Sequence, residues 1–239
     1  MKEKTASRAR LFHHFIRWTV FMIGLMVMAF GIVLMIEANI GSAPWDVFHI
    51  GLHLQLGLTI GTWSIIAGLF IIGLTAAITR KRPQAGAIIN MLLVGVFIDL
   101  FMLIPWIQTP ANMVSQVIMF LVGLLICGYG IGLYIAPKCG AGPRDSLMLA
   151  LTELTGWKVQ WVRGAMEVIV LLCGWLLGGP VFIGTLIFTF GIGHIVGFSL
   201  PQCQKLIDKI TNVKHVGGVQ IENINQGTIR INNHDGVSQ

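Results

Sequence analysis

Long runs of apolar residues dominate the chain, and short polar segments separate them. Each run has about twenty residues, the length that an α-helix needs to cross the hydrocarbon core of a bilayer. The runs lack the apolar and polar alternation of barrel strands, so helices are the structure that pairs their backbone polar groups in lipid. We therefore predict six membrane-spanning helices, at residues 15–36, 60–79, 86–104, 113–136, 159–177 and 181–200.

A second pattern is an internal repeat with an offset of 99 residues. The segment GIVLMIEANIGSAPWD at 31–46 corresponds to GIGLYIAPKCGAGPRD at 130–145, with seven identities in sixteen positions. Each copy contains three predicted spans, an odd number, so the second copy enters the membrane from the opposite side. We predict an all-α polytopic membrane protein of two inverted three-helix repeats. Its parts are a basic leader (1–14), a first repeat (15–104), a second repeat (105–200) and a polar tail (201–239).

Each repeat also contains a segment that is too short to span, at residues 45–57 and 144–156. Each segment follows a Gly-x-x-Pro-x-Asp turn, which favours a chain reversal into the start of a helix. These helices are either re-entrant or interfacial. Their N-termini are candidate anion sites, because unpaired N–H groups and a partial positive charge gather there. The simpler interpretation is a tight turn in which Asp46 and Asp145 offset the helix dipole, and both carboxylates could equally bind a cation or a proton.

The position of the charges predicts the orientation. Only 11% of residues are charged, against about 25% in soluble domains. Lys and Arg are absent from the loops at 37–59, 105–112 and 178–180 and occur in the segments on the other side. The positive-inside rule then places both termini in the cytoplasm. Topology and anionic lipid account for the net charge of +6, so we expect no nucleic-acid partner.

Ionisable residues inside spans are functional candidates, because a charge in lipid is costly. Arg163 and Glu167 lie four residues apart on one face of the fifth span, and a structural ion pair is the simplest interpretation. Asp99 lies in the third span. The seven tryptophans mostly fall near segment ends, where they are expected to be interfacial anchors. They are Trp18, Trp45, Trp63, Trp106, Trp157, Trp161 and Trp175.

Asp46, His49 and His53 are spaced three and four residues apart, a spacing that can hold a divalent metal. The second repeat carries Met148 and Thr152 at the two histidine positions, so this set is not part of the repeated design. We therefore favour interfacial histidines and expect no metal. The sequence contains no HExxH, nucleophile elbow, phosphate loop or nucleotide fingerprint, so we expect neither a cofactor nor an enzyme.

The tail beyond residue 210 is polar. Alternation at Val219 and Ile221, and again at Ile229 and Ile231, could form a hairpin with its turn at 225–227. An isolated hairpin is only marginally stable, so disorder is an equal alternative.

Five segments resemble the YczE/YitT-like family of bacterial integral membrane proteins, most of all its YczE branch. They are GSAPWDVFHIGL at 41–52, GTWSIIAGL at 61–69, GAGPRDSLMLAL at 140–151, WVRGAMEV at 161–168 and LLGGPVFIGTL at 176–186. The resemblance implies a location in the bacterial cell membrane and the architecture described above. It implies no activity, because the family has no established substrate or reaction. It marks Pro44, Asp46, Pro143, Arg144, Asp145, Arg163 and Glu167 as matching the family's motifs.

Three classes of function compete. The leading hypothesis is a small-solute secondary transporter or permease with its site between the repeats. The second is a non-transporting scaffold or regulator of a partner protein, and the third, an intramembrane enzyme, is disfavoured. Expected partners are the lipid bilayer and a small-molecule or ion substrate, and a homo-oligomer or membrane partner stays open. The candidate substrate-binding residues are Gly41, Pro44, Asp46, Gly140, Pro143, Arg144, Asp145, Arg163 and Glu167.

Overall fold

Eight helices make up the membrane part of the protein. The computed structural model describes residues 2–140, 142–211, 213–216, 219–222 and 230–232, and side chains within 14–140 and 142–210. Among these residues, six helices are long and apolar enough to cross a bilayer, which confirms a multi-pass helical membrane protein. They are α1 (Lys2–Glu37), α3 (Ile60–Thr79), α4 (Ala85–Met102), α5 (Met113–Ile135), α7 (Val159–Leu176) and α8 (Ile183–Thr211), while α2 (Pro44–Leu56) and α6 (Pro143–Thr155) are short.

Polar side chains fix where α3 begins. At the start of α3, the Thr59 hydroxyl oxygen accepts a hydrogen bond from the Thr62 N–H (3.1 Å). Asp99, near the end of α4, accepts from the Thr59 hydroxyl (2.6 Å) and from the Gly61 N–H (2.9 Å). These bonds satisfy donors that the first helical turn leaves unpaired. Asp99 is therefore a cap of the neighbouring helix, which gives this charge within a span a structural role.

Helix α8 continues past the predicted end of its span at residue 200. Pro201 lies inside the helix. The turns that follow it are held by packing, because Cys203 and Ile207 are buried against Ala136 beyond the end of α5. The Ser199 hydroxyl also donates to the Gly128 carbonyl (2.9 Å). The part of the predicted tail up to Thr211 thus belongs to the last helix.

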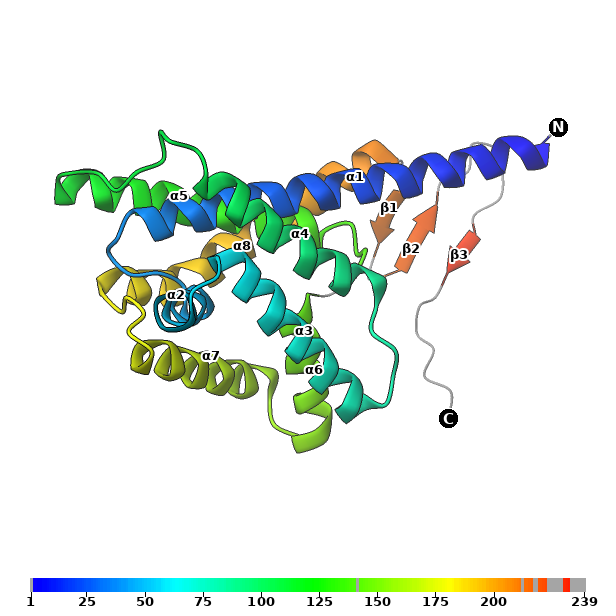
Figure 1. Ribbon diagram of the computed structural model, residues 1–239. Helices are drawn as coiled ribbons and strands as arrows, with labels where there is room; N and C mark the ends of the chain where they lie inside the picture. The colour runs from blue at the N-terminus through cyan, green and yellow to red at the C-terminus, as the bar shows by residue number, and fades with distance from the viewer. Residues whose placement is uncertain (1, 141, 212, 217–218, 223–229, 233–239) are drawn as a thin grey trace.

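The centre of the molecule is the pair α1 and α5, which lie side by side in Figure 1. Their backbones approach closely at glycines. A Cβ on Gly31 would lie 2.4 Å from the Cys127 nitrogen, and a Cβ on Gly130 would lie 2.3 Å from the Met28 nitrogen. The residue numbers of the contacts rise along α1 as they fall along α5, so the two helices are antiparallel. The internal repeat relates these two contacts to each other, because Met28 corresponds to Cys127 and Gly31 to Gly130. Each contact is therefore the other with its two partners exchanged.

The two short helices pack mainly against α3 and α7. Helix α2 packs on α7 and α3, and α6 packs on α3 and α7. Figure 1 shows α2 nearly end-on, across the direction of α1 and α7. At the contact with α7, a Cβ on Gly51 would lie 2.8 Å from the Gly174 carbonyl oxygen. Most of the first two turns of α2 is buried, whereas only Pro143, Leu147 and Ala150 are buried in α6.

Three short strands follow α8: β1 (Val213–Val216), β2 (Val219–Glu222) and β3 (Arg230–Asn232). They form an antiparallel sheet in the order β1-β2-β3. Ile221 pairs with Ile231, as in the hairpin alternative that the sequence leaves open, while β1 is an addition to it. The predicted turn at 225–227 and Ile229 lie outside the described residues.

Candidate functional site

The first turns of α2 and α6 meet inside the molecule. The guanidinium carbon of Arg144, in α6, lies 4.5 Å from the centroid of the Trp45 ring, in α2. A cation over an indole face is an attractive contact, and it is stronger where water is excluded. Trp45 is 7% exposed, so its predicted role as an interfacial anchor is wrong. The repeat places Trp45 and Arg144 at corresponding positions, and the fold brings them into contact.

The start of α2 buries an acid and an imidazole. Asp46 is 2% exposed and His49 is 1% exposed, with 4.0 Å between Asp46 Oδ1 and His49 Nδ1. His49 Nδ1 has no hydrogen-bond partner. The prediction of an interfacial histidine is wrong at His49, because the face of α2 that carries it packs inward. It agrees with the exposed His53, whose Nδ1 lies 2.5 Å from the Leu58 carbonyl oxygen and apart from the buried pair.

The surroundings of Asp46 favour its neutral form. Burial raises the pKa of Asp46 to about 6, the Arg144 guanidinium opposes this rise, and the Glu167 carboxylate adds to it. Burial lowers the pKa of His49 well below its usual value, and Arg144 lowers it further. Asp46 can therefore gain or lose a proton near neutral pH while His49 stays neutral.

The start of α6 faces a group of polar side chains. A Cβ placed on Gly142 would lie 3.5 Å from Asp145 Oδ2 and 3.8 Å from both Asn90 Oδ1 and the Tyr134 hydroxyl. Asn90 is 7% exposed, and its Nδ2 has no hydrogen-bond partner. The N-cap residues of the two short helices, Ala43 and Gly142, provide no side-chain cap. A bound solute could supply the missing partners.

Helix α7 contributes Arg163 and Glu167. Among the described residues, the ion pair predicted between them is not formed: no nitrogen–oxygen distance is 4.0 Å or less. Arg163 is exposed, whereas Glu167 is partly buried. Helical spacing alone could not give this difference in burial.

The two candidate glycines shape the loops before the short helices. Gly41 has φ +103° and Gly140 has φ +148°, conformations that residues with a side chain rarely adopt. A Cβ on Gly41 would lie 2.8 Å from Thr185 Oγ1, and one on Gly140 would lie 2.8 Å from the Gly86 Cα. The loops therefore pack on the starts of α8 and α4. Pro44 and Pro143 occupy the first turns of α2 and α6, which suits the fixed φ of proline.

The structure adds residues that the sequence did not single out for this site. Asn90 and Tyr134 lie at the start of α6, and Thr185 lies beside the loop that leads into α2. Thr185 is 1% exposed, and its Oγ1 has no hydrogen-bond partner. A polar residue in an apolar span was the available signal for Asn90. Only the packing could assign it to the same region as Asp145.

The polar groups around the two helix starts can change both their charge and their pairing. Donors and acceptors from α2, α4, α5, α6 and α7 gather around the two helix starts, and Asp46 on α2 lies on a different helix from Arg144 on α6. A shift of one helix against another would change their pairing, and a protonation change at Asp46 would change the net charge. These are the properties expected of a binding site whose state depends on charge.

Comparison with known proteins gives the family. Residues 15–201 match the model of a family of unknown function, DUF6198. The uncharacterized membrane protein YczE of Bacillus subtilis (strain 168) is 46% identical over 195 residues, which cover 81% of this chain and 89% of that protein. An uncharacterized protein of Haemophilus influenzae is 31% identical over 188 residues, 79% of this chain and 85% of that protein. No solved structure matches. The chain belongs to the DUF6198 family, and the resemblance to YczE-like proteins is confirmed.

Proposed function

We propose that this protein is a secondary transporter or permease for a small polar solute, with its binding site between two inverted repeats in the bacterial cell membrane. The positive-inside rule supports a cytoplasmic location of both termini. The function rests on the site and not on the relatives, whose names give no activity.

The contacts between α1 and α5 support the inverted arrangement. The contact of Gly31 with Cys127 has its counterpart in that of Gly130 with Met28, with the partners exchanged as around a two-fold axis. Because α1 and α5 are antiparallel, that axis is perpendicular to both helices. If the helices cross the bilayer, the axis lies in the membrane plane, which is the relation between inverted repeats in transporters. In this scheme α2 and α6 are the re-entrant helices of the two repeats.

The observation that carries the proposal is the meeting of the two helix starts around buried charge. Arg144 covers Trp45, and the adjacent Asp46 is almost completely buried. A buried carboxylate in a membrane protein is costly, which favours a functional role over a structural one. Transporters with broken helices direct helix N-termini at anionic groups of the substrate, while nearby acidic groups bind the coupling ion.

The charges assign the roles in this mechanism. Arg144 and the first turn of α6 bind an anionic or polar group of the solute. Asp46 takes up or releases a proton, because the site around it stabilises the neutral carboxyl. Asp145 and Glu167 contribute acceptors, and Arg163 balances their charge. Rocking of one repeat against the other exposes the helix starts to each side of the membrane in turn.

Solute flux into proteoliposomes is the direct test. The wild-type protein is screened with a broad panel of small acids, amines, amino acids and sugars, with and without a pH gradient. We expect uptake of at least one class, and a reduction of at least about tenfold for Arg144→Gln and Asp46→Asn, equivalent to the loss of about 1.4 kcal/mol. Asp99→Asn is the matched control, because Asp99 is a carboxylate that caps α3 away from the site.

Gly142→Ala tests the site without removing a charge. The added methyl group meets Asp145, Asn90 and Tyr134 at ordinary contact distances, so the fold should tolerate it. We expect weaker solute binding with little change in thermal stability, because the methyl group occupies space among polar groups.

A different result supports the scaffold hypothesis. If no solute in the panel gives flux or a thermal shift, and a stoichiometric membrane partner is retained by the Asp46→Asn, Asp145→Asn and Glu167→Gln triple variant, then the transport proposal is wrong.

A further inference from the structure

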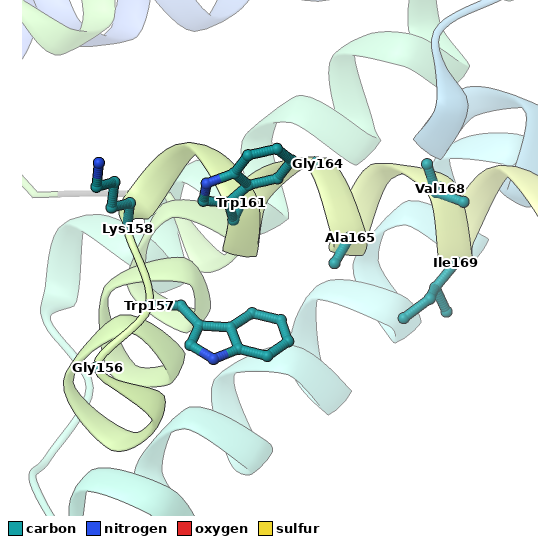
Figure 2. A pocket seen from close by; sticks show the side chains of 8 residues that line it. All are labelled: Gly156, Trp157, Lys158, Trp161, Gly164, Ala165, Val168 and Ile169. Atoms are coloured by element: carbon teal, nitrogen blue, oxygen red, sulfur yellow. The ribbon is translucent and has the colours of Figure 1, made fainter.

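The outer face of α7 carries a groove that is separate from the helix starts. The groove encloses about 950 Å³ and is mainly apolar. Figure 2 shows Ala165 and Ile169 pointing to the side of α7 on which the Trp157 ring lies. The lining residues are Gly156, Trp157, Lys158, Trp161, Gly164, Ala165, Val168 and Ile169.

The helical spacing places this groove away from the protein interior. Trp161, Ala165 and Val168 recur at intervals of three and four residues, so they form one stripe. At about 100° per residue, Arg163 and Glu167 lie on the opposite side of the helix. Of the six described spans, α7 is the least buried. The groove therefore faces the lipid in the proposed membrane arrangement.

The length of the groove matches one leaflet. Val159, the first residue of α7, and Ile169 are ten residues apart, which corresponds to about 15 Å along a helix. This is half of the roughly 30 Å hydrocarbon core. Trp157 and Trp161 lie at one end of the groove, and both are exposed by 60% or more. Tryptophans in such positions are typical of the level of the lipid headgroups.

The charge at that end of the groove indicates which kind of molecule binds there. Lys158 lines the groove, is exposed, and forms no ion pair with the residues that the structure describes. The lining contains no acidic residue. A second copy of this chain packed symmetrically over the groove would bring two lysines together without a carboxylate from the lining. An anionic headgroup supplies the missing negative charge, while its acyl chain covers the apolar stripe.

We propose that this groove binds one anionic phospholipid, with the phosphate at Lys158 and an acyl chain along Gly164, Ala165 and Val168. The proposal is independent of transport, because it uses the face of α7 that the solute site does not.

Native mass spectrometry of the full chain tests the proposal. The purified protein is mixed with phosphatidylglycerol or with phosphatidylcholine of the same acyl composition, and the bound lipid is counted. We expect tighter binding of phosphatidylglycerol. Lys158→Gln should weaken it about fivefold, the effect of one lysine near an anionic headgroup, and should leave phosphatidylcholine unchanged.

A pair of glycine variants tests the apolar part of the groove. A Cβ on Gly164 or on Gly73 meets nothing within 4 Å, and both glycines are exposed on long helices. Gly164→Leu fills the groove and should weaken binding of both lipids, whereas Gly73→Leu, on α3, should bind as the wild type does. If Gly164→Leu lowers the yield of folded protein, Lys158→Gln decides alone.

Two outcomes overturn the proposal. One is equal affinity for the two lipids in the wild type, or unchanged phosphatidylglycerol binding in Lys158→Gln. The other is complete disulfide formation between copies carrying Ala165→Cys in native membranes, with the four native cysteines replaced, because a second copy would then cover the groove.

Discussion

Single glycines decide how closely α1 and α5 approach. At Gly31 the space for a Cβ is already occupied by the backbone of Cys127, and backbone atoms cannot rotate away as a flexible side chain can. Small residues at helix contacts allow the close packing on which association in lipid depends. The conformational freedom of glycine, which destabilises helix interiors by up to about 1 kcal/mol, is the cost of this contact.

We expect Gly31→Ala to destabilise the protein by about 1–3 kcal/mol, the usual cost of inserting atoms into a packed interface. Thermal unfolding of the purified protein in detergent, followed by circular dichroism, measures the change. Gly73→Ala is the matched control, because its Cβ meets nothing within 4 Å, and it should be neutral or slightly stabilising. Equal unfolding temperatures for the two variants would contradict the close contact.

Asp46 makes stability depend on pH. Its pKa of about 6 in the folded protein is higher than the ordinary value of 3.8 for an aspartate, so the folded state binds the proton more tightly. This contribution is fully present below about pH 4 and is lost as the pH rises through about 6, by roughly 2–3 kcal/mol at most. Asp46→Asn should remove this component from the stability profile of the wild-type protein. A profile that is identical in both proteins would exclude a raised pKa at Asp46.

At the scale of the element, hydropathy predicts spans better than it predicts their ends. The six predicted spans agree with the helices because lipid demands long apolar runs. Helix α8 differs, since Cys203 and Ile207 gain burial against residues near the end of α5, and this contact is not visible in the local sequence. The turns before α2 and α6 were predictable because proline and glycine restrict the backbone locally.

The capping of α3 by Asp99 gives a prediction at this scale. Asp99→Ala removes the acceptor of both the Thr59 hydroxyl and the Gly61 N–H, so we expect a loss of about 1–2 kcal/mol in unfolding free energy. Asp99→Asn keeps an acceptor oxygen and should lose less. Thermal unfolding of the two variants separates the roles: equal losses would mean that the charge of Asp99 matters and its hydrogen bonds do not.

At the scale of the whole molecule, the sequence predicted the candidate residues but not their partners. The charged groups were identifiable because ionisable residues are rare in spans. The partner of Arg144 is an aromatic ring from the other repeat, and Arg163 and Glu167 form no ion pair within the part of the chain that the structure describes. Such choices depend on how separate helices pack, so helical spacing gave the wrong pairing on α7.

The membrane topology can be tested with exposed positions that follow the two short helices. Leu58 and Trp157 are 57% and 60% exposed. Each directly follows the glycine that ends its short helix, Gly57 or Gly156. In a variant with the four native cysteines replaced, we expect Leu58→Cys to react with an impermeant maleimide from outside intact cells. Trp157→Cys should react only after the cells are opened. Labelling of both from the same side would rule out inverted repeats.

The contacts of Gly31 with Cys127 and of Gly130 with Met28 resemble those of an interface between identical molecules, since each is the other with the partners exchanged. A shorter polypeptide containing a single copy could build the same surface with another molecule of itself, provided that the two molecules were inserted head to tail. The connection at residues 105–112 removes that requirement. Once both halves belong to one chain, each can change independently. One such divergence is His49, whose equivalent position in the second repeat is Met148.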